Sequence, residues 1–123
     1  MSAMAWTRRS ALALGAATLA APALAEETRR SRLILLGTGG GPTPKPNRSA
    51  PANAIMVDGV VYVIDCGNGV ARQMVLAGLP LKALRAVFLT HQHSDHNADY
   101  GNLLLLSWAA DLASKVDTMG HRR

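Results

Sequence analysis

The segment Thr90-His91-Gln92-His93-Ser94-Asp95-His96 places three of the four histidines of the chain beside a carboxylate. Imidazole nitrogens and carboxylate oxygens are ligands for zinc and similar divalent ions. His91 and His93 are two residues apart, so in an extended backbone their rings point to one side and can bind one ion together. Asp95 and His96 are offset from them and can bind a second ion nearby. Two ions about 3.5–4 Å apart can share a bridging hydroxide, which indicates a hydrolase.

An ordinary polar loop at the start of a helix is the alternative interpretation. Ser94 is placed to cap a following helix, and Asp95 in the first turn suits the helix dipole. That interpretation does not account for three histidines clustered beside these residues, so we favour a metal site. The ligand types accept zinc, manganese and iron, and the pattern does not choose among these metals.

The elements around this loop predict an α/β fold. Apolar runs at 33–36, 54–57 and 60–64 indicate strands, and the pair Asp58-Gly59 indicates a hairpin between the last two. A short helix is expected to begin at Val70 and end at Gly78. The run 87–89 is apolar without alternation, as in a strand buried on both faces, and leads into the histidine loop. A helix packed on most sides is expected over 97–113.

Glycines follow the first expected strand, in the sequence Gly37-Thr38-Gly39-Gly40-Gly41-Pro42. The segment fails the dinucleotide-binding pattern at its last position, no helical pattern follows it, and no Gly-Lys-Ser/Thr appears. Both the dinucleotide-binding and the P-loop interpretations are therefore rejected. We expect these glycines to let the backbone turn close to the site.

Taken together, three segments resemble the metallo-β-lactamase superfamily, in its ribonuclease Z-like branch. They are the histidine loop after a buried strand, Leu36-Gly37-Thr38-Gly39-Gly40-Gly41, and Val63-Ile64-Asp65-Cys66-Gly67-Asn68-Gly69. The resemblance runs from about Leu33 to about Gly120. It implies the N-terminal half of an αββα sandwich, in which two sheets pack together between outer helices.

The resemblance also implies roles for individual residues. His91 and His93 would bind a first zinc ion, and Asp95 and His96 a second. Asp95 would also orient or deprotonate the attacking water, which makes it the expected catalytic residue. Asp65 would support a ligand imidazole from beneath the site. The alternative for Asp65, equally weighted, is a turn residue that satisfies its own loop backbone.

The chain departs from the family pattern beyond the histidine loop. The complete family site adds a histidine, an aspartate and another histidine farther along, and His121 is the one histidine after His96. His121 is expected to belong to a solvated tail. We therefore expect a truncated hydrolase that is inactive alone, from a parent acting on a phosphodiester, sulfate or other ester. The alternative is a non-catalytic zinc-binding fragment.

The N-terminus carries an export pattern. Arg8 and Arg9 precede an apolar run over 11–21 that is too short to cross a bilayer, and Ala23-Leu24-Ala25 fits a cleavage site. The arginine pair resembles a twin-arginine signal, which predicts a periplasmic or secreted protein without stable membrane insertion. The expected organisation is a signal, a flexible basic segment, the partial domain and a tail, over residues 1–25, 26–32, 33–120 and 121–123.

Charge and cysteine content bound the remaining functions. The net charge of +5 comes partly from basic residues at 29, 30 and 32, which form a short cluster without interleaved aromatic residues. Export also argues against tRNA processing, because that substrate stays in the cytoplasm, so we expect a small-molecule ester as substrate and no nucleic-acid partner. Cys66 is the only cysteine, so no intrachain disulfide forms. We expect it to be a small buried side chain, not a nucleophile.

Overall fold

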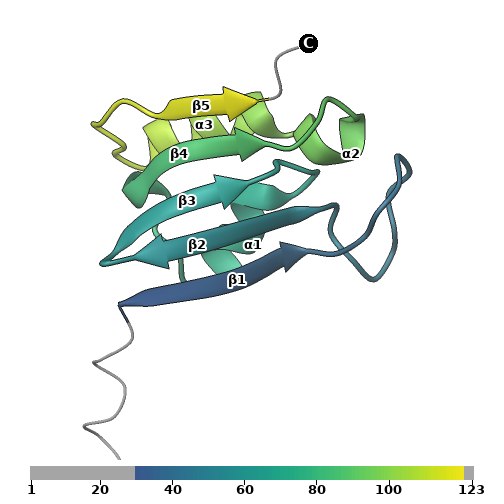
Figure 1. The fold of residues 1–123 in the computed structure, drawn as a ribbon, viewed down its shortest axis with the longest axis horizontal. Helices are drawn as coiled ribbons and strands as arrows, with labels where there is room; N and C mark the ends of the chain where they lie inside the picture. Colours follow the sequence, from purple (N-terminus) through teal and green to yellow (C-terminus); the bar gives the residue numbers. More distant parts are fainter. Residues whose placement is uncertain (1–29, 121–123) are drawn as a thin grey trace, which may run out of the picture.

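The structure is a computed structural model that describes residues 30–120. The expected export signal and His121 lie outside these residues. Five strands form one sheet in the order β1-β2-β3-β4-β5 (Figure 1). The elements are β1 (Ser31–Gly37), β2 (Ala52–Val57), β3 (Val60–Ile64), α1 (Val70–Leu76), the 3-10 helix η1 (Leu81–Ala83), β4 (Leu84–Leu89), α2 (Ser94–Asn97), α3 (Tyr100–Ala109) and β5 (Asp117–Gly120). Between residues 30 and 120, no helix has the length and apolarity to span a membrane.

The predicted hairpin joins β2 to β3. Asp58 and Gly59 both adopt left-handed backbone angles, φ 48° and 82°, and Val57 pairs with Val60 across the turn. This is the two-residue turn that an Asp-Gly pair favours. Strands β3 and β4 are parallel and are connected through α1, and β4 and β5 are parallel and are connected through α3. The carboxyl ends of β1, β3, β4 and β5 therefore lie at one edge of the sheet (Figure 1).

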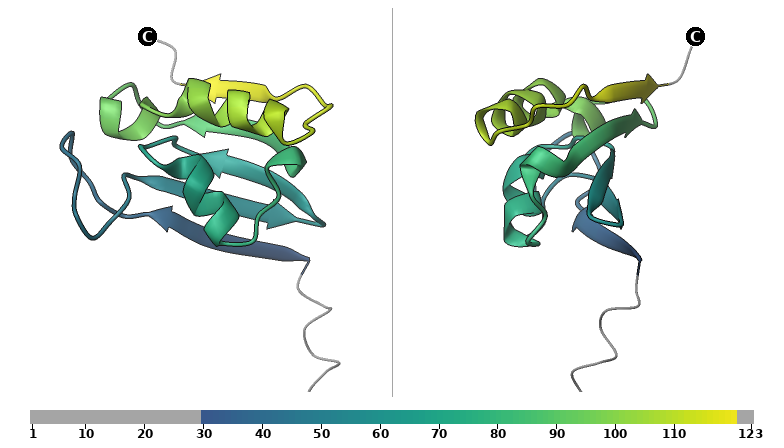
Figure 2. Two further views of the ribbon diagram at one scale, coloured as in Figure 1. Left: turned by 180° about the vertical axis from the view of Figure 1, so that it is seen from behind. Right: turned by 90° about the vertical axis from the view of Figure 1, so that its left-hand side faces the viewer.

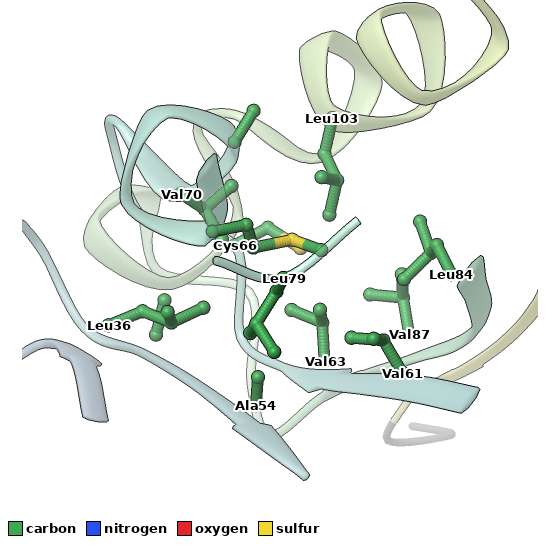
Figure 3. Packing of buried hydrophobic residues seen from close by; sticks show 13 residues of the cluster. Leu36, Ala54, Val61, Val63, Cys66, Val70, Leu79, Leu84, Val87 and Leu103 are labelled. Carbon is green, nitrogen blue, oxygen red and sulfur yellow. The ribbon is translucent and has the colours of Figure 1, made fainter. Parts of the chain in front are cut away.

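The three α-helices of residues 30–120 lie on the same side of the sheet (Figure 2). The hydrophobic core lies between the helices and the sheet, and the inward side chains of the strands are part of it. Figure 3 shows its centre, where Val63 of β3 and Val87 of β4 lie near Leu103 of α3. Each fully buried side chain of this size contributes about 1.5–3 kcal/mol to folding. This packing fixes β3, β4 and the loops that follow them.

The opposite face of the sheet is uncovered in the described part of the chain. Its large apolar side chains are exposed to solvent: Leu33, Leu35, Ile55, Val57 and Met119. We call these five residues the outer face. The prediction that 87–89 is buried on both faces is therefore wrong, because Val87 is buried on the helix side whereas Phe88 and Leu89 are half-buried.

The expected helix over 97–113 is also incorrect in two respects. The chain forms the short helix α2, breaks at Ala98 and Asp99, and continues as α3 from Tyr100. The helix α3 buries Leu103 and Ser107 on one side, whereas Trp108 is 73% exposed. It is therefore packed along a single stripe and not on most sides.

Candidate metal centre

The predicted metal ligands lie at the carboxyl edge of the sheet. The histidine loop leaves β4 and enters α2, and the turn at Asp65 follows β3 beside it. The long loop after β1 extends from the same edge (Figure 1). Three loops that are distant in sequence therefore meet at one end of a rigid sheet, which suits the positioning of ligands.

The three histidine rings gather on one side of this loop. The centroids of the His91 and His93 rings are 4.7 Å apart, and those of His91 and His96 are 4.0 Å apart. The Nδ1 atom of His91 lies 3.0 Å from the hydroxyl of Thr90. The spacing argument for His91 and His93 thus agrees with the structure, and His96 joins them although it comes from α2.

Asp95 and His96 form a second pair. The Oδ2 atom of Asp95 lies 3.5 Å from Nε2 of His96, and both side chains are mostly buried. Two ligands of a tetrahedral zinc, each about 2.0–2.2 Å from it, stand about 3.4 Å apart. The separation of this pair therefore fits two ligands of one ion. Ser94 makes no capping hydrogen bond, and His93 occupies the N-cap position of α2, so the capping alternative for Ser94 is wrong.

Asp65 supports His96 from beneath. Its Oδ2 atom lies 2.8 Å from Nδ1 of His96, and its carboxylate also accepts hydrogen bonds from the amide and the hydroxyl of Thr90. The carboxylate contacts other segments and not its own turn, so the expected contact with a histidine of the loop is confirmed, and that histidine is His96. A carboxylate at Nδ1 keeps the proton there and leaves the Nε2 lone pair free. Asp65 is 4% exposed and has a left-handed φ of 64°, which aspartate tolerates.

The four predicted ligands approach one another in pairs. Within residues 30–120, no group of three or more His, Cys, Asp or Glu side chains forms a site that could hold a metal ion as it stands. The ligand roles of His91, His93, Asp95 and His96 therefore stay predictions. The donor types are those that zinc takes, since imidazoles and a carboxylate approach one another in pairs and one imidazole is already oriented by Asp65.

The glycine loop approaches the site as expected. The amide of Gly41 donates a 2.9 Å hydrogen bond to Oδ2 of Asp95, 54 residues away in sequence. Gly41 has a φ of 95°, which favours glycine. Asp95 is thereby held by the loop after β1 as well as by its own helix.

A cleft of about 840 Å³ lies between this loop, α1 and α2. Asp95 and Ser94 contribute to its wall near the histidines. Basic side chains from two other segments also line it: Lys45, Arg48 and Arg72. Sequence inspection missed this cluster, because Arg72 belongs to α1 and the other two belong to the loop after β1.

Cys66 is fully buried behind the site. Burial, together with the nearby carboxylates of Asp65 and Asp99, raises the pKa of its thiol to about 12. A thiol that stays protonated is a poor nucleophile. The expectation of a small buried side chain is confirmed.

The sequence is similar to those of known proteins. The sequence model of the metallo-beta-lactamase superfamily matches residues 49–122. Ribonuclease Z of Mycobacterium marinum is 42% identical over 82 residues, which is 67% of this chain and 29% of the relative. Ribonuclease Z of Mycolicibacterium paratuberculosis is 43% identical over 76 residues, 62% of this chain and 27% of the relative. The chain thus spans less than a third of the length of these relatives.

Solved structures agree on the fold. The short form of human tRNase Z superposes with a TM-score of 0.58 at 32% identity, covering 61% of this chain and 29% of that structure. The metallo-beta-lactamase fold protein YhfI from Bacillus subtilis gives a TM-score of 0.63 at 26% identity, covering 74% of this chain and 36% of that structure. The five-stranded sheet with helices on one side therefore matches part of this α/β fold, as predicted.

The relatives contradict one expectation from sequence, that of a small-molecule ester as substrate and no nucleic-acid partner. They are ribonuclease Z proteins, and a similar solved structure is a tRNase. The expectation rested on the export pattern and on the short basic cluster near the N-terminus, and neither contains information on the basic residues that line the cleft of the folded chain. With a family model that matches more than half of its length, the chain belongs to the metallo-beta-lactamase superfamily.

Proposed function

We propose that this chain carries part of the site of a metal-dependent hydrolase that cleaves phosphodiester bonds in RNA. The observation that carries the proposal is the Asp95–His96 pair. Its ligand atoms are 3.5 Å apart, Asp65 orients the imidazole, and the pair lies beside a basic cleft. Relatives that are ribonuclease Z proteins support RNA as the substrate.

His91 and His93 would hold one zinc ion, and Asp95 and His96 a second. When bound, two such ions supply Lewis acidity and a hydroxide nucleophile near neutral pH. Manganese or iron would suit the same donors. The hydrogen bond that Nδ1 of His96 donates to Asp65 keeps the imidazole in the tautomer that a metal requires.

The other side chains act on the substrate. Asp95 lies at the wall of the cleft, where its carboxylate would orient the attacking water or accept its proton. Lys45, Arg48 and Arg72 line the same cleft and would bind phosphates of the RNA backbone. Contacts to phosphates position a nucleic acid without reading its base sequence.

Zinc content and RNA cleavage together test the proposal. The purified protein is measured for bound zinc and then incubated with a fluorescently labelled RNA oligonucleotide, with and without a chelator. We expect stoichiometric zinc. Chelator-sensitive cleavage would support the catalytic part of the proposal and overturn the expectation that the chain is inactive alone, and His93→Ala should then remove both. Asp58→Asn, at the distant β2–β3 turn, is the matched control. Zinc without cleavage would refute the catalytic part and favour a non-catalytic zinc-binding role, and absence of zinc would refute the whole proposal.

The export pattern adds a location to this proposal. We propose that the twin-arginine-like segment directs the protein to the periplasm. Replacing Arg8 and Arg9 by lysine should retain the protein in the cytoplasm, as cell fractionation would show. Unchanged export of the double variant would contradict a twin-arginine route.

A further inference from the structure

The backbone of α2 and of the residues after it is attached to the turn that follows β3. The amide of Cys66 donates a 2.6 Å hydrogen bond to the carbonyl of His96, and the amide of Asp99 donates a 2.9 Å hydrogen bond to the carbonyl of Cys66. These two bonds hold the main chain of His96 against the turn. The His96 side chain is held separately, by the contact between its Nδ1 atom and Asp65.

The carboxylate of Asp99 completes this attachment. Its Oδ2 atom accepts a 2.7 Å hydrogen bond from the amide of Gly69, and its Oδ1 atom accepts a longer one, 3.4 Å, from the side-chain amide of Asn68. Gly69 is the N-cap residue of α1. Asp99 therefore connects the break between α2 and α3 to the start of α1.

The position of Asp99 makes this use of its carboxylate unusual. Asp99 is the N-cap residue of α3, where an aspartate ordinarily accepts a hydrogen bond from the first turn of its own helix. No such capping bond forms, and the carboxylate is directed to Gly69 instead. The break in the helix also frees the Asp99 amide to reach Cys66, which a continuous helix would not allow, because each amide inside a helix bonds within it.

We infer that Asp99 is a positioning residue that holds His96 in place for metal binding, an inference that rests on the proposed function. The His96 imidazole is fixed at Nδ1 by Asp65, and its main chain is fixed by the bonds that Asp99 completes. Loss of the Asp99 carboxylate would release the end of α2 and change the separation between His96 and Asp95. Nothing in the proposed chemistry uses Asp99 directly, so its effect acts through His96.

Asp99→Ser separates positioning from simple stability. Asp99 has φ −103° and ψ 14°, outside the extended region in which an N-cap side chain reaches the amides of its own helix, so serine would leave α3 uncapped as aspartate does. The shorter serine side chain cannot reach the amide of Gly69. Loss of that bond should lower the free energy of unfolding of the metal-free protein, so zinc affinity is compared at a temperature where both proteins are fully folded.

Zinc affinity, measured by competition with a chromophoric chelator, should fall about 10-fold in Asp99→Ser, as for other groups that orient metal ligands. The absorption bands of the cobalt-substituted protein should shift with the changed geometry at His96. Asp99→Asn should restore most of the affinity, because its amide oxygen can still accept from Gly69. Asp117→Asn, on β5, serves as control and should match the unchanged protein.

Two results would overturn the inference in distinguishable ways. A folded Asp99→Ser variant with unchanged zinc affinity and unchanged cobalt spectrum would overturn it alone. Absence of zinc binding by the unchanged protein would overturn the proposed function and, with it, this inference. If Asp99→Ser does not fold, the inference is tested with Asp99→Asn, which keeps the contact to Gly69 and should therefore keep most of the zinc affinity. A loss of zinc affinity in Asp99→Asn as large as that in His93→Ala would contradict the inference.

Discussion

Replacing Asp65 by asparagine tests how the site prepares His96. Asparagine has the same shape and tolerates the left-handed φ of 64° at this position. It cannot accept hydrogen bonds at both of its terminal atoms. The amide of Thr90 must face the asparagine oxygen, so the NH₂ group would face Nδ1 of His96, which now lies 2.8 Å from Oδ2.

Two donors facing each other repel, so His96 would have to move its proton from Nδ1 to Nε2. The protonated Nε2 atom could then no longer bind a metal. Partners that orient metal-binding histidines typically contribute 10- to 100-fold to metal affinity, which is about 1.4–2.7 kcal/mol. A hydrogen bond involving a charged group contributes a similar amount, about 1.5–3 kcal/mol, to stability. We therefore expect Asp65→Asn to weaken zinc binding 10- to 100-fold.

The assay is competition for zinc against a chromophoric chelator at a temperature where the metal-free variant is fully folded. Asp58→Asn is the matched control, because Asp58 also has a left-handed φ, of 48°, and lies at the exposed β2–β3 turn. Its zinc affinity should equal that of the unchanged protein. A folded Asp65→Asn protein that binds zinc within about 3-fold of the unchanged protein would refute the role given to the Asp65–His96 contact.

Three further predictions concern the surroundings of the site. A Cβ on Gly67 would overlap the carbonyl oxygen of Asp95 and lie 2.7 Å from the Cβ of Ala50 and from the carbonyl oxygen of Pro51. Gly67→Ala should therefore lower the free energy of unfolding, measured by urea titration, by about 1–3 kcal/mol and weaken zinc binding. An unchanged free energy of unfolding and zinc affinity would contradict this close approach. The pKa of the Cys66 thiol is about 12 in the folded protein against an ordinary value of 9.0, so the unfolded chain ionises first as the pH rises. The free energy of unfolding should therefore not change below pH 9 and should fall by about 1.4 kcal/mol per pH unit between pH 9 and pH 12. A Cys66→Ala variant with the same pH slope would exclude Cys66 as the cause. Arg72→Ala should weaken RNA binding and reduce the slope of log affinity against log salt by about 0.7, whereas an unchanged slope would place the RNA elsewhere.

The sequence was most informative where local chemistry decides the structure. The Asp58-Gly59 pair determines the β2–β3 turn, and the spacing of His91 and His93 brings their rings to one side. Neither feature depends on distant residues. Patterns of this kind act within a few residues of the backbone.

Features that depend on distant contacts could not be predicted in this way. At the break between α2 and α3 the Asp99 amide bonds to Cys66, and the 97–113 pattern carries no sign of that partner. The exposure of Trp108 likewise depends on which neighbours α3 has. The basic cleft combines Arg72 with the loop after β1, so it required the fold. The Asp65–His96 contact spans 31 residues and was anticipated through family resemblance alone.

The outer face and the candidate site belong to the same strands, so burial of the outer face would also stabilise the site. The strands that bear the outer face also carry the core on their inward side, and the loops of the site leave their carboxyl ends. Burying one large apolar side chain contributes about 1.5–3 kcal/mol. The five side chains are between 36% and 69% exposed, so covering all of them would contribute about 4–8 kcal/mol, against a net stability of about 5–15 kcal/mol for a whole domain. A change from leucine to lysine at Leu33 or Leu35 would then act at a distance, lowering the population of the ordered site without touching a metal ligand.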